Sequence, residues 1–492
     1  MRYVGALDQG TTSTRFMIFD ETGAIFSSDQ REHRQILPQA GWVEHDANEI
    51  WQRTQEVIHG ALKKAGISGS QLSAIGITNQ RETTVAWNRT TGEPLSNAIV
   101  WQDTRTTQML NRLTASEQEE VISRTGLAIA PYFSASKMTW LLEQKDGVDS
   151  GEICLGTIDS WLIFKLTGHR VHATDVTNAS RTMLMDLQTL DWNPKLLELF
   201  GVKRHMLPEI KSSIANFGET DPKGPFDSAI PIAGVLGDQQ AAMFGQVCFN
   251  RGESKTTYGT GNFALFNTGT EIVRSKHGLL TTLCYQFEGQ APIYALEGSV
   301  AVTGSAVQWL RDQLQIIEKS SDIEALAQSV PDSGDLYFVP AFSGLFAPHW
   351  RSDARGVIVG MTRASTKAHI ARATLEAICF QTRDVLDAMV KDSGVNLHEM
   401  KVDGGITVNK LCMQMQADIM QIDISRPVIN ETTALGAAYA AGLTVGIWKD
   451  QEELRAKWQE SARFKPDNKS PLSTAGYTRW QKAIKRTLDW VE

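Results

Sequence analysis

The segment LDQGTTST, residues 7–14, places a glycine and a run of hydroxyl side chains directly after a short apolar stretch. Gly10 permits a tight turn, and hydroxyls beside backbone N–H groups are donors that suit a phosphate. Asp8 stands next to this turn, which suggests that it holds a Mg²⁺ ion bridging phosphate oxygens. A plain β-hairpin turn, with the Asp bonding locally, is the alternative interpretation. The hydroxyl donors to the phosphate would be Thr11, Thr12 and Ser13, and Arg15 would add a positive charge.

Two later turns have similar chemistry. YGTGNF (258–263) and VDGGITVNK (402–410) each follow a short apolar stretch and combine glycine with threonine. Each motif is a weak signal alone. Three such turns fit a nucleotide clasped between two lobes, and closure of the lobes would exclude water from the transferred phosphoryl group.

The elements that must position these turns alternate between strand and helix. Residues 3–7, 15–20 and 24–28 predict a β-meander, and 73–78 and 97–103 predict strands that end in polar clusters. A helix is predicted from Asp46 to Gly66, since Asp46 with Glu49 resembles a capping box and Gly66 is a stop signal. The fold class is therefore α/β.

The second half of the chain repeats the pattern of the first. SKTTYGTGNFALFN (254–267) is again strand, Gly-Thr-Gly turn and strand, and each half has a helix of small residues, at 237–246 and 431–443. Small residues let helices approach closely, as expected where two lobes cross near a hinge. Such elements also recur in any α/β chain, so this alternative stays open. The duplication predicts two lobes, 1–248 and 249–492.

Composition excludes several classes of partner. The 492 residues are 42% hydrophobic and 21% charged, with a net charge of −8, which argues against nucleic acid or an anionic membrane as partner. The five scattered cysteines form no C-x-x-C pair and fit a reducing compartment. The first residues lack the apolar core of a signal peptide, and no apolar run is long enough for membrane insertion. We therefore expect a cytoplasmic protein.

The ordered set of motifs resembles the FGGY family of carbohydrate kinases. The stretches that carry the resemblance are ALDQGTTSTR, TNQRETTVAWN, VWQDTR, GDQQAA, YGTGNF, DARGVIVGMTR and VDGGITVN, together with YFSASKMTWLLEQ (132–144) and GVIVGMTRASTKAHIARATLE (356–376). The resemblance runs end to end. It implies the actin–hexokinase–heat-shock chaperone fold, in which two lobes of duplicated ribonuclease H-like fold enclose the active site in the cleft between them.

The resemblance implies ATP-dependent phosphorylation of glycerol to sn-glycerol 3-phosphate, with Mg²⁺ on the phosphates and a homodimer or homotetramer as the assembly. The N-terminal lobe would bind polyol and phosphate, and the C-terminal lobe the nucleotide. Nucleotide contacts would fall on Thr11, Thr12, Ser13, Arg15, Thr260, Gly304, Gln308, Gly405 and Asn409, with Asp8 on the metal. Polyol contacts would fall on Arg81, Glu82, Trp101, Tyr132, Asp238, Gln239 and Phe263.

Asp238 is the implied base, which accepts the proton of the terminal hydroxyl as its oxygen attacks the γ-phosphorus. Capping of a helix N-terminus is the alternative role, and both can hold together. For Arg81 and Glu82 the alternative is an exposed ion pair, and for Trp101 it is a place in the core.

The chain departs from the family where regulation is concerned. Some members bind fructose 1,6-bisphosphate through a Gly-Thr-Arg loop, but Ser228 and Ala229 stand where Thr-Arg would be. Other members are activated by phosphorylation of a His just upstream of the base, and residues 212–230 contain no His. Neither control is expected. Kinases for other polyols or ketoses, a nucleotide-switched filament or chaperone-type protein, and a non-enzymatic scaffold are the competing functions.

Overall fold

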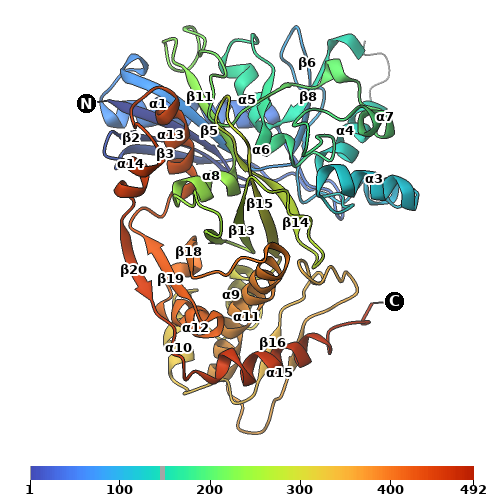
Figure 1. Cartoon of the computed structure of the whole chain (residues 1–492), viewed down its shortest axis with the longest axis vertical. Coiled ribbons are helices and arrows are strands. Elements are labelled where there is room, and N and C mark those ends of the chain that lie inside the picture. The colour runs from blue at the N-terminus through green and yellow to red at the C-terminus, as the bar shows by residue number, and fades with distance from the viewer. Residues whose placement is uncertain (1, 145–149, 492) are drawn as a thin grey trace.

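The computed structural model describes residues 2–144 and 150–491. Two lobes are visible in Figure 1, with the N-terminal half in blue to green above and most of the C-terminal half in yellow to red below. Among the described residues, none of the helices has the length and apolar character needed to cross a membrane. All five cysteines are buried and free of disulfides.

The N-terminal lobe is built on a five-stranded sheet in the order β11-β5-β1-β2-β3. β1 (Tyr3–Gln9), β2 (Ser13–Asp20) and β3 (Ile25–Glu32) form an antiparallel meander, as the sequence predicted. β5 (Leu72–Asn79) and β11 (Ile232–Gly237) then add in parallel to β1.

The C-terminal lobe repeats this order within a seven-stranded sheet, β14-β15-β13-β12-β18-β19-β20. Its strands are β12 (Ser254–Tyr258), β13 (Asn262–Gly269), β14 (Leu280–Tyr285), β15 (Ile293–Val300), β18 (Glu399–Asp403), β19 (Asp423–Pro427) and β20 (Glu460–Phe464). β12 pairs with β13 and β13 with β15 in antiparallel fashion, whereas β18 and β19 continue in parallel from β12. The predicted duplication is therefore confirmed by the sheet topology.

Helices and short strands complete both lobes. The helices are α1 (Ala47–Ala65), α2 (Thr107–Leu110), α3 (Ala115–Thr125), α4 (Ser134–Glu143), α5 (Ile158–Leu166), α6 (Val176–Ala179), α7 (Pro194–Leu199), α8 (Asp238–Gly245), α9 (Gly304–Asp312), α10 (Asp322–Gln328), α11 (Lys367–Ser393), α12 (Lys410–Met420), α13 (Thr432–Thr444), α14 (Gln451–Lys457) and α15 (Ala475–Ile484). The short strands are β4 (Glu44–His45), β6 (Thr84–Asn88), β7 (Ala98–Ile99), β8 (Ile153–Thr157), β9 (Ala173–Asp175), β10 (Glu209–Lys211), β16 (Tyr337–Val339) and β17 (Val357–Val359). The 3₁₀ turns are η1 (Gly69–Gln71), η2 (Ser150–Glu152), η3 (Arg204–Met206), η4 (Gly405–Val408) and η5 (Pro471–Ser473).

Two local predictions need correction. Asp46 caps α1 by accepting from the N–H groups of Asn48 and Glu49, but the Glu49 side chain pairs with Arg34 and Arg53 instead of closing a capping box. The strand predicted over 97–103 is only β7, because the chain turns after Ile99. In both cases contacts with distant residues replace the local pattern.

The two helices of small residues cross between the lobes. α13, from the C-terminal half, packs on β1, β5 and β11, while α8 packs on α13 and on strands β12 to β14. A Cβ atom on Gly436 would overlap the backbone of Ala241, and one on Gly245 would overlap the carbonyl of Thr432. The small residues are therefore required by the close approach of the two helices, as the sequence indicated.

Gly436→Ala is expected to lower the free energy of unfolding by about 1–3 kcal/mol, because the added methyl forces the helices apart. The loss outweighs the gain of about 1 kcal/mol that Ala brings to a helix. Denaturant unfolding measures it. The matched control is Gly356→Ala, where the nearest atom lies 3.5 Å from the added carbon. Equal stability of the two variants would contradict this packing.

Candidate active site

Strand register brings three loops of the N-terminal lobe to one edge of the sheet. Asp8 on β1 is level with Thr78 on β5, and Asn79 is level with Gly237 on β11. All three strands run in the same direction, so the loops after them emerge side by side. Ligands in open α/β sheets bind at the carboxyl ends of such strands. The edge therefore carries the glycine-threonine turn, the Arg81–Glu82 loop and the start of α8, which is Asp238.

The carboxylate of Asp8 suits a metal that is held partly by phosphates. Burial raises its pKa to about 7, Arg15 opposes that rise, and Glu431 and Asp238 add to it. Across the described residues no group of three or more metal-ligating side chains occurs. Mg²⁺ commonly uses one or two carboxylates with waters and substrate phosphates, so a single, half-buried Asp fits it.

If Asp8 holds Mg²⁺, a proton will compete with the metal below neutral pH, because the pKa of Asp8 is about 7. The apparent affinity for Mg·ATP is expected to fall as pH drops from 8 to 6, approaching about tenfold per pH unit on the acid side. Titration calorimetry across this range measures it. The Asp8→Asn variant, which keeps the titration of the nucleotide alone, should bind more weakly and show a flatter profile. Parallel profiles for both proteins would remove Asp8 from the metal site.

The glycine-threonine turn is closed by a hydrogen bond from Gly10 N to Ser13 O of 2.9 Å. Trp101 Nε1 donates to Thr11 Oγ1 at 3.0 Å, which links this turn to the predicted polyol side. Arg15 forms an ion pair with Glu431, at the start of α13. The charge of Arg15 therefore also joins the two halves of the chain.

Arg81 and Glu82 are buried, with 3% and 1% of their surface exposed, so the alternative of an exposed ion pair is wrong. Arg81 Nε lies 3.0 Å from Asp238 Oδ1, and its two terminal nitrogens contact the carboxylate of Glu297 on β15 at 2.5 and 3.1 Å. Arg181 Nε donates to Glu82 at 2.7 Å and its Nη2 to Glu297 at 3.0 Å. Two guanidinium groups and three carboxylates thus form one network that joins the lobes and is buried except at Asp238.

The electrostatics of the network differ from one carboxylate to the next. Burial opposes the ionisation of Glu297, but Arg181 and Arg81 outweigh it and lower its pKa to about 2. For Glu82 burial dominates and raises the pKa, despite the same two arginines. Glu82 also has a φ of +60°, an uncommon conformation for a residue other than glycine. Glu82 is therefore a strained, buried acceptor, as a hydroxyl-binding group at a functional site would be.

Arg181 and Glu297 are the two members of this network that the sequence patterns did not indicate. The available signal for Glu297 is a charged residue inside the apolar strand YALEGSV (294–300). Arg181 follows the short helix α6 and carries no comparable pattern. Glu297 acquires its two arginine partners only when the lobes come together, whereas Arg181 and Glu82 pair within the N-terminal lobe across 99 positions of the sequence.

Three aromatic residues predicted to contact the polyol lie together. The ring of Trp101 meets Tyr132 at 5.4 Å and Phe263, from the other lobe, at 6.4 Å between centroids, both edge to face. All three are only half-buried, so Trp101 is not a core residue. Burial raises the pKa of Tyr132, which keeps its hydroxyl protonated. The cluster presents apolar surface and one hydroxyl beside the charged network.

Asp238 is the first residue of α8, and its cap position is occupied by Gly237. Its Oδ1 accepts from Gln239 N at 2.7 Å, and 31% of the side chain is exposed. The helix N-terminus favours a negative charge at this point. Gln239 Oε1 accepts from Lys255 Nζ, whose pKa burial lowers to about 8. The carboxylate of Asp238 therefore combines local anchoring with access to a ligand.

In the C-terminal lobe, two predicted nucleotide turns follow adjacent parallel strands. Thr257 on β12 is level with Asp403 on β18, so the turns after these strands are neighbours. Gly404 has a φ of +92° and lies against the backbone of Tyr258, where a side chain would overlap the chain. A Cβ on Gly405, by contrast, would meet open space. Gly405 thus leaves room next to the turn.

The remaining predicted nucleotide residues surround these turns. Thr260 is exposed at the tip of the first turn, and Gly304, which begins α9, donates its N–H to Gly259 O at 3.1 Å. Gln308 is exposed one turn further along α9. Asn409 caps α12 by accepting from the backbone at 2.8 Å, so its oxygen is already engaged, while its amide N–H₂ remains a donor.

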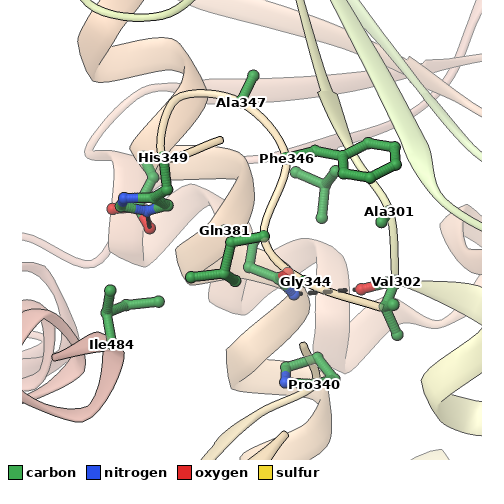
Figure 2. Close-up of a pocket in the computed structure, with 12 residues that line it drawn as sticks. Ala301, Val302, Pro340, Gly344, Phe346, Ala347, His349, Gln381 and Ile484 are labelled. Atoms are coloured by element: carbon green, nitrogen blue, oxygen red, sulfur yellow. Dashed lines mark hydrogen bonds and ion pairs between the residues drawn. The ribbon is translucent and has the colours of Figure 1, made fainter. Parts of the chain in front are cut away.

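A small pocket elsewhere in the C-terminal lobe is not a substrate site. Figure 2 shows it between the 340–349 loop, α11 and the end of β15, with Gln381 Nε2 donating to Val302 O at 3.2 Å. Its volume is about 10 Å³, which is room for one water at most.

Comparison with known proteins defines the class of the chain. The model of the N-terminal domain of the FGGY family of carbohydrate kinases matches residues 3–245, and the model of its C-terminal domain matches residues 255–445. The chain belongs to the FGGY family of carbohydrate kinases, and it is an enzyme of the kinase class. The family resemblance read from the motifs is confirmed.

Individual proteins of known class are similar to the chain over its full length. The chain is 60% identical to the glycerol kinase of Mycolicibacterium vanbaalenii, covering 100% of this chain and 99% of that protein. It is 58% identical to glycerol kinase 1 of Streptomyces coelicolor over the same shares. The crystal structure of Plasmodium falciparum glycerol kinase with ADP aligns with a TM-score of 0.93 at 40% identity, covering 99% of this chain and 98% of that one. The predicted two-lobed fold is thereby confirmed.

Proposed function

We propose that the protein transfers the γ-phosphoryl group of ATP to glycerol and forms sn-glycerol 3-phosphate. The observation that carries the proposal is the strand register that puts Asp8, Arg81 and Asp238 at one sheet edge, beside the glycine-threonine turn. Relatives of about the same length and about 60% identity are glycerol kinases, which supports glycerol over other polyols.

Asp238 is the proposed base. Arg81 holds one carboxylate oxygen at 3.0 Å, and the partly exposed side chain accepts a hydrogen bond from the terminal hydroxyl of glycerol. That hydroxyl oxygen attacks the γ-phosphorus in line, and its proton passes to the carboxylate as the bond to ADP breaks. Phosphoryl transfer has a loose transition state, so orientation of the hydroxyl matters more than the basicity of the Asp.

The remaining hydroxyls are assigned to Arg81, Glu82 and Gln239, which supply donors and acceptors. The carbon chain lies against Trp101 and Phe263. Buried polar groups of this kind reject a substrate that lacks a hydroxyl, because they are left unpaired.

Thr11, Thr12, Ser13, Arg15 and Thr260 are proposed to bind the phosphates, and Gly304, Gln308, Gly405 and Asn409 the rest of the nucleotide. Asp8 is proposed to hold Mg²⁺, which when bound neutralises charge on the phosphate oxygens. We further propose lobes spanning 1–248 and 249–492, a cytoplasmic location, and a homodimer or homotetramer.

A coupled assay of ADP release tests this function. Glycerol should raise the rate far above that with ATP alone, and xylitol, other polyols, gluconate and pentuloses should be poor substrates. Preference for a pentulose or gluconate would assign a different sugar substrate to the same fold. ADP release that does not respond to any acceptor would instead indicate a nucleotide switch.

A further inference from the structure

The glycine-threonine turn is supported from behind by hydrogen bonds to its carbonyl groups. Gly10 O accepts from Gln80 Nε2 at 3.2 Å. Thr11 O accepts from His33 Nε2 at 3.0 Å and from Gln35 Nε2 at 2.9 Å. Thr12 O accepts from the backbone N–H of His33 at 3.2 Å. Three successive carbonyls are thus drawn to one side of the turn.

The planar trans peptide converts this arrangement into a donor surface. In each peptide unit the C=O and the following N–H point in opposite directions. When the carbonyls of residues 10 and 11 face His33, Gln35 and Gln80, the N–H groups of Thr11 and Thr12 face away from them. Successive N–H groups that point to the same side bind anions.

The donors behind the turn form a continuous chain. His45 Nε2 donates to Gln35 Oε1 at 2.9 Å. His45 Nδ1 lies 3.3 Å from Gln80 Nε2, whose two hydrogens are shared with Gln9 Oε1 at 2.9 Å and Gly10 O at 3.2 Å. Gln35 then donates to Thr11 O, which only accepts, so the orientation of each group is set by the next. Gln80 directly precedes Arg81, which connects the chain to the buried charged network.

The two imidazoles are suited to a neutral, fixed role. His33 is 7% exposed and packs edge to face on His45, with 4.7 Å between ring centroids. Since Nε2 of His33 donates to a carbonyl, its Nδ1 is unprotonated, and within the described residues this buried atom has no hydrogen-bond partner. Burial lowers the pKa of His33, and burial followed by the nearby His33 lowers that of His45 to about 3. Both rings therefore remain neutral in the working range of pH.

We propose that His33, bonded directly to Thr11 O, and His45, acting through Gln35, are positioning residues that turn the amides of Thr11 and Thr12 toward the terminal phosphates of ATP. The proposal rests on the assignment of this turn to the phosphates under the proposed function. Neither histidine touches the substrate. Each fixes the direction of a backbone donor, so its loss should affect ATP and leave glycerol binding unchanged.

Two substitutions at one position test this role. His33→Gln keeps an N–H donor near the place of Nε2, whereas His33→Asn puts the amide near the place of Nδ1 and leaves Thr11 O with one donor fewer. We expect His33→Asn to weaken ATP binding on the order of tenfold. We expect His33→Gln to stay within about twofold of the wild type, and both to keep the KM for glycerol. Calorimetry of ATP binding and the two KM values are the measurements, with unfolding temperature as the control for folding.

Gln35→Ala is the second variant, and because Gln35 lies at the surface its removal leaves the core intact. A loss of ATP affinity of roughly fivefold is expected, with the KM for glycerol unchanged. If His33→Asn does not fold, the ATP affinity of Gln35→Ala alone tests the proposal. Wild-type ATP affinity in Gln35→Ala, equal losses in His33→Gln and His33→Asn, or a parallel rise in both KM values would overturn the proposal.

The calorimetric measurement does not require turnover, so the two proposals can fail separately. Absence of glycerol-dependent ADP release with the expected ATP-binding pattern would reject the proposed function and retain the role of the histidines. Normal glycerol-dependent turnover with unchanged ATP binding in the variants would retain the proposed function and reject the role of the histidines.

Discussion

Asp238→Asn lowers kcat by about 10²–10⁴-fold and changes the affinity for ATP little, if Asp238 is the base. The substitution keeps the shape of the side chain and its oxygen contacts with Arg81 and Gln239 N, but it removes the ability to take a proton. The largest part of the loss should appear in kcat, because the missing interaction forms as the hydroxyl oxygen attacks. Steady-state kinetics with both substrates varied measures it.

The control for this substitution is Asp191→Asn, an exposed carboxylate whose side chain is 62% accessible and pairs with Arg204. It should leave kcat and stability near wild-type values. If Asp238→Asn also keeps a near-normal kcat, Asp238 is not the base, and its role is limited to ion pairing with Arg81.

Glu297→Gln should destabilise the protein by about 3–5 kcal/mol at pH 7, because Arg81 and Arg181 are left without their shared buried carboxylate. The KM for glycerol should also rise, since Arg81 loses the contact that directs it toward Asp238. Denaturant unfolding and kinetics are the two measurements. A substitution in the core of either lobe would reduce stability without this selective effect on glycerol.

The loss of stability in Glu297→Gln depends on pH in a defined direction. The pKa of Glu297 is lowered from 4.5 in the unfolded chain to about 2, so its stabilising contribution is complete above 4.5 and is lost as pH falls toward 2. The difference between wild type and Glu297→Gln should therefore shrink on acidification. Glu271→Gln, which breaks an exposed pair with Arg251, is the matched control and should cost less than about 1 kcal/mol. Equal losses of stability in the two variants would show that the buried network stabilises the protein no more than an exposed ion pair does.

The part of the fold that is encoded locally could be predicted from the sequence. The meander β1–β3 and the ends of α1 depend on alternation, on Asp46 and on Gly66, and the structure confirms them. The duplication was visible because both halves use the same strand–turn–strand unit. β7 was overestimated, since an apolar run does not reveal where the chain must turn to bring Trp101 to the site.

The candidate site was predictable to the extent that its residues follow strands. Asp8, Arg81, Glu82 and Asp238 all stand at or just after a strand end, where polar residues are conspicuous in the sequence. Glu297 was missed because its partner Arg81 lies 216 positions away in the sequence. Arg181 was missed because its partner Glu82 lies 99 positions away. The Arg181–Glu82 pair becomes visible only once the N-terminal lobe is folded, and the Arg81–Glu297 pair only once the two lobes are assembled.

The decisive experiment is a crystal structure of the chain with glycerol, Mg²⁺ and a non-hydrolysable ATP analogue. We expect a terminal hydroxyl of glycerol within hydrogen-bond distance of Asp238 and in line with the γ-phosphorus, whose oxygens contact the amides of the 10–13 turn. Glycerol bound away from Asp238, or a triphosphate bound away from that turn, would contradict the proposed mechanism.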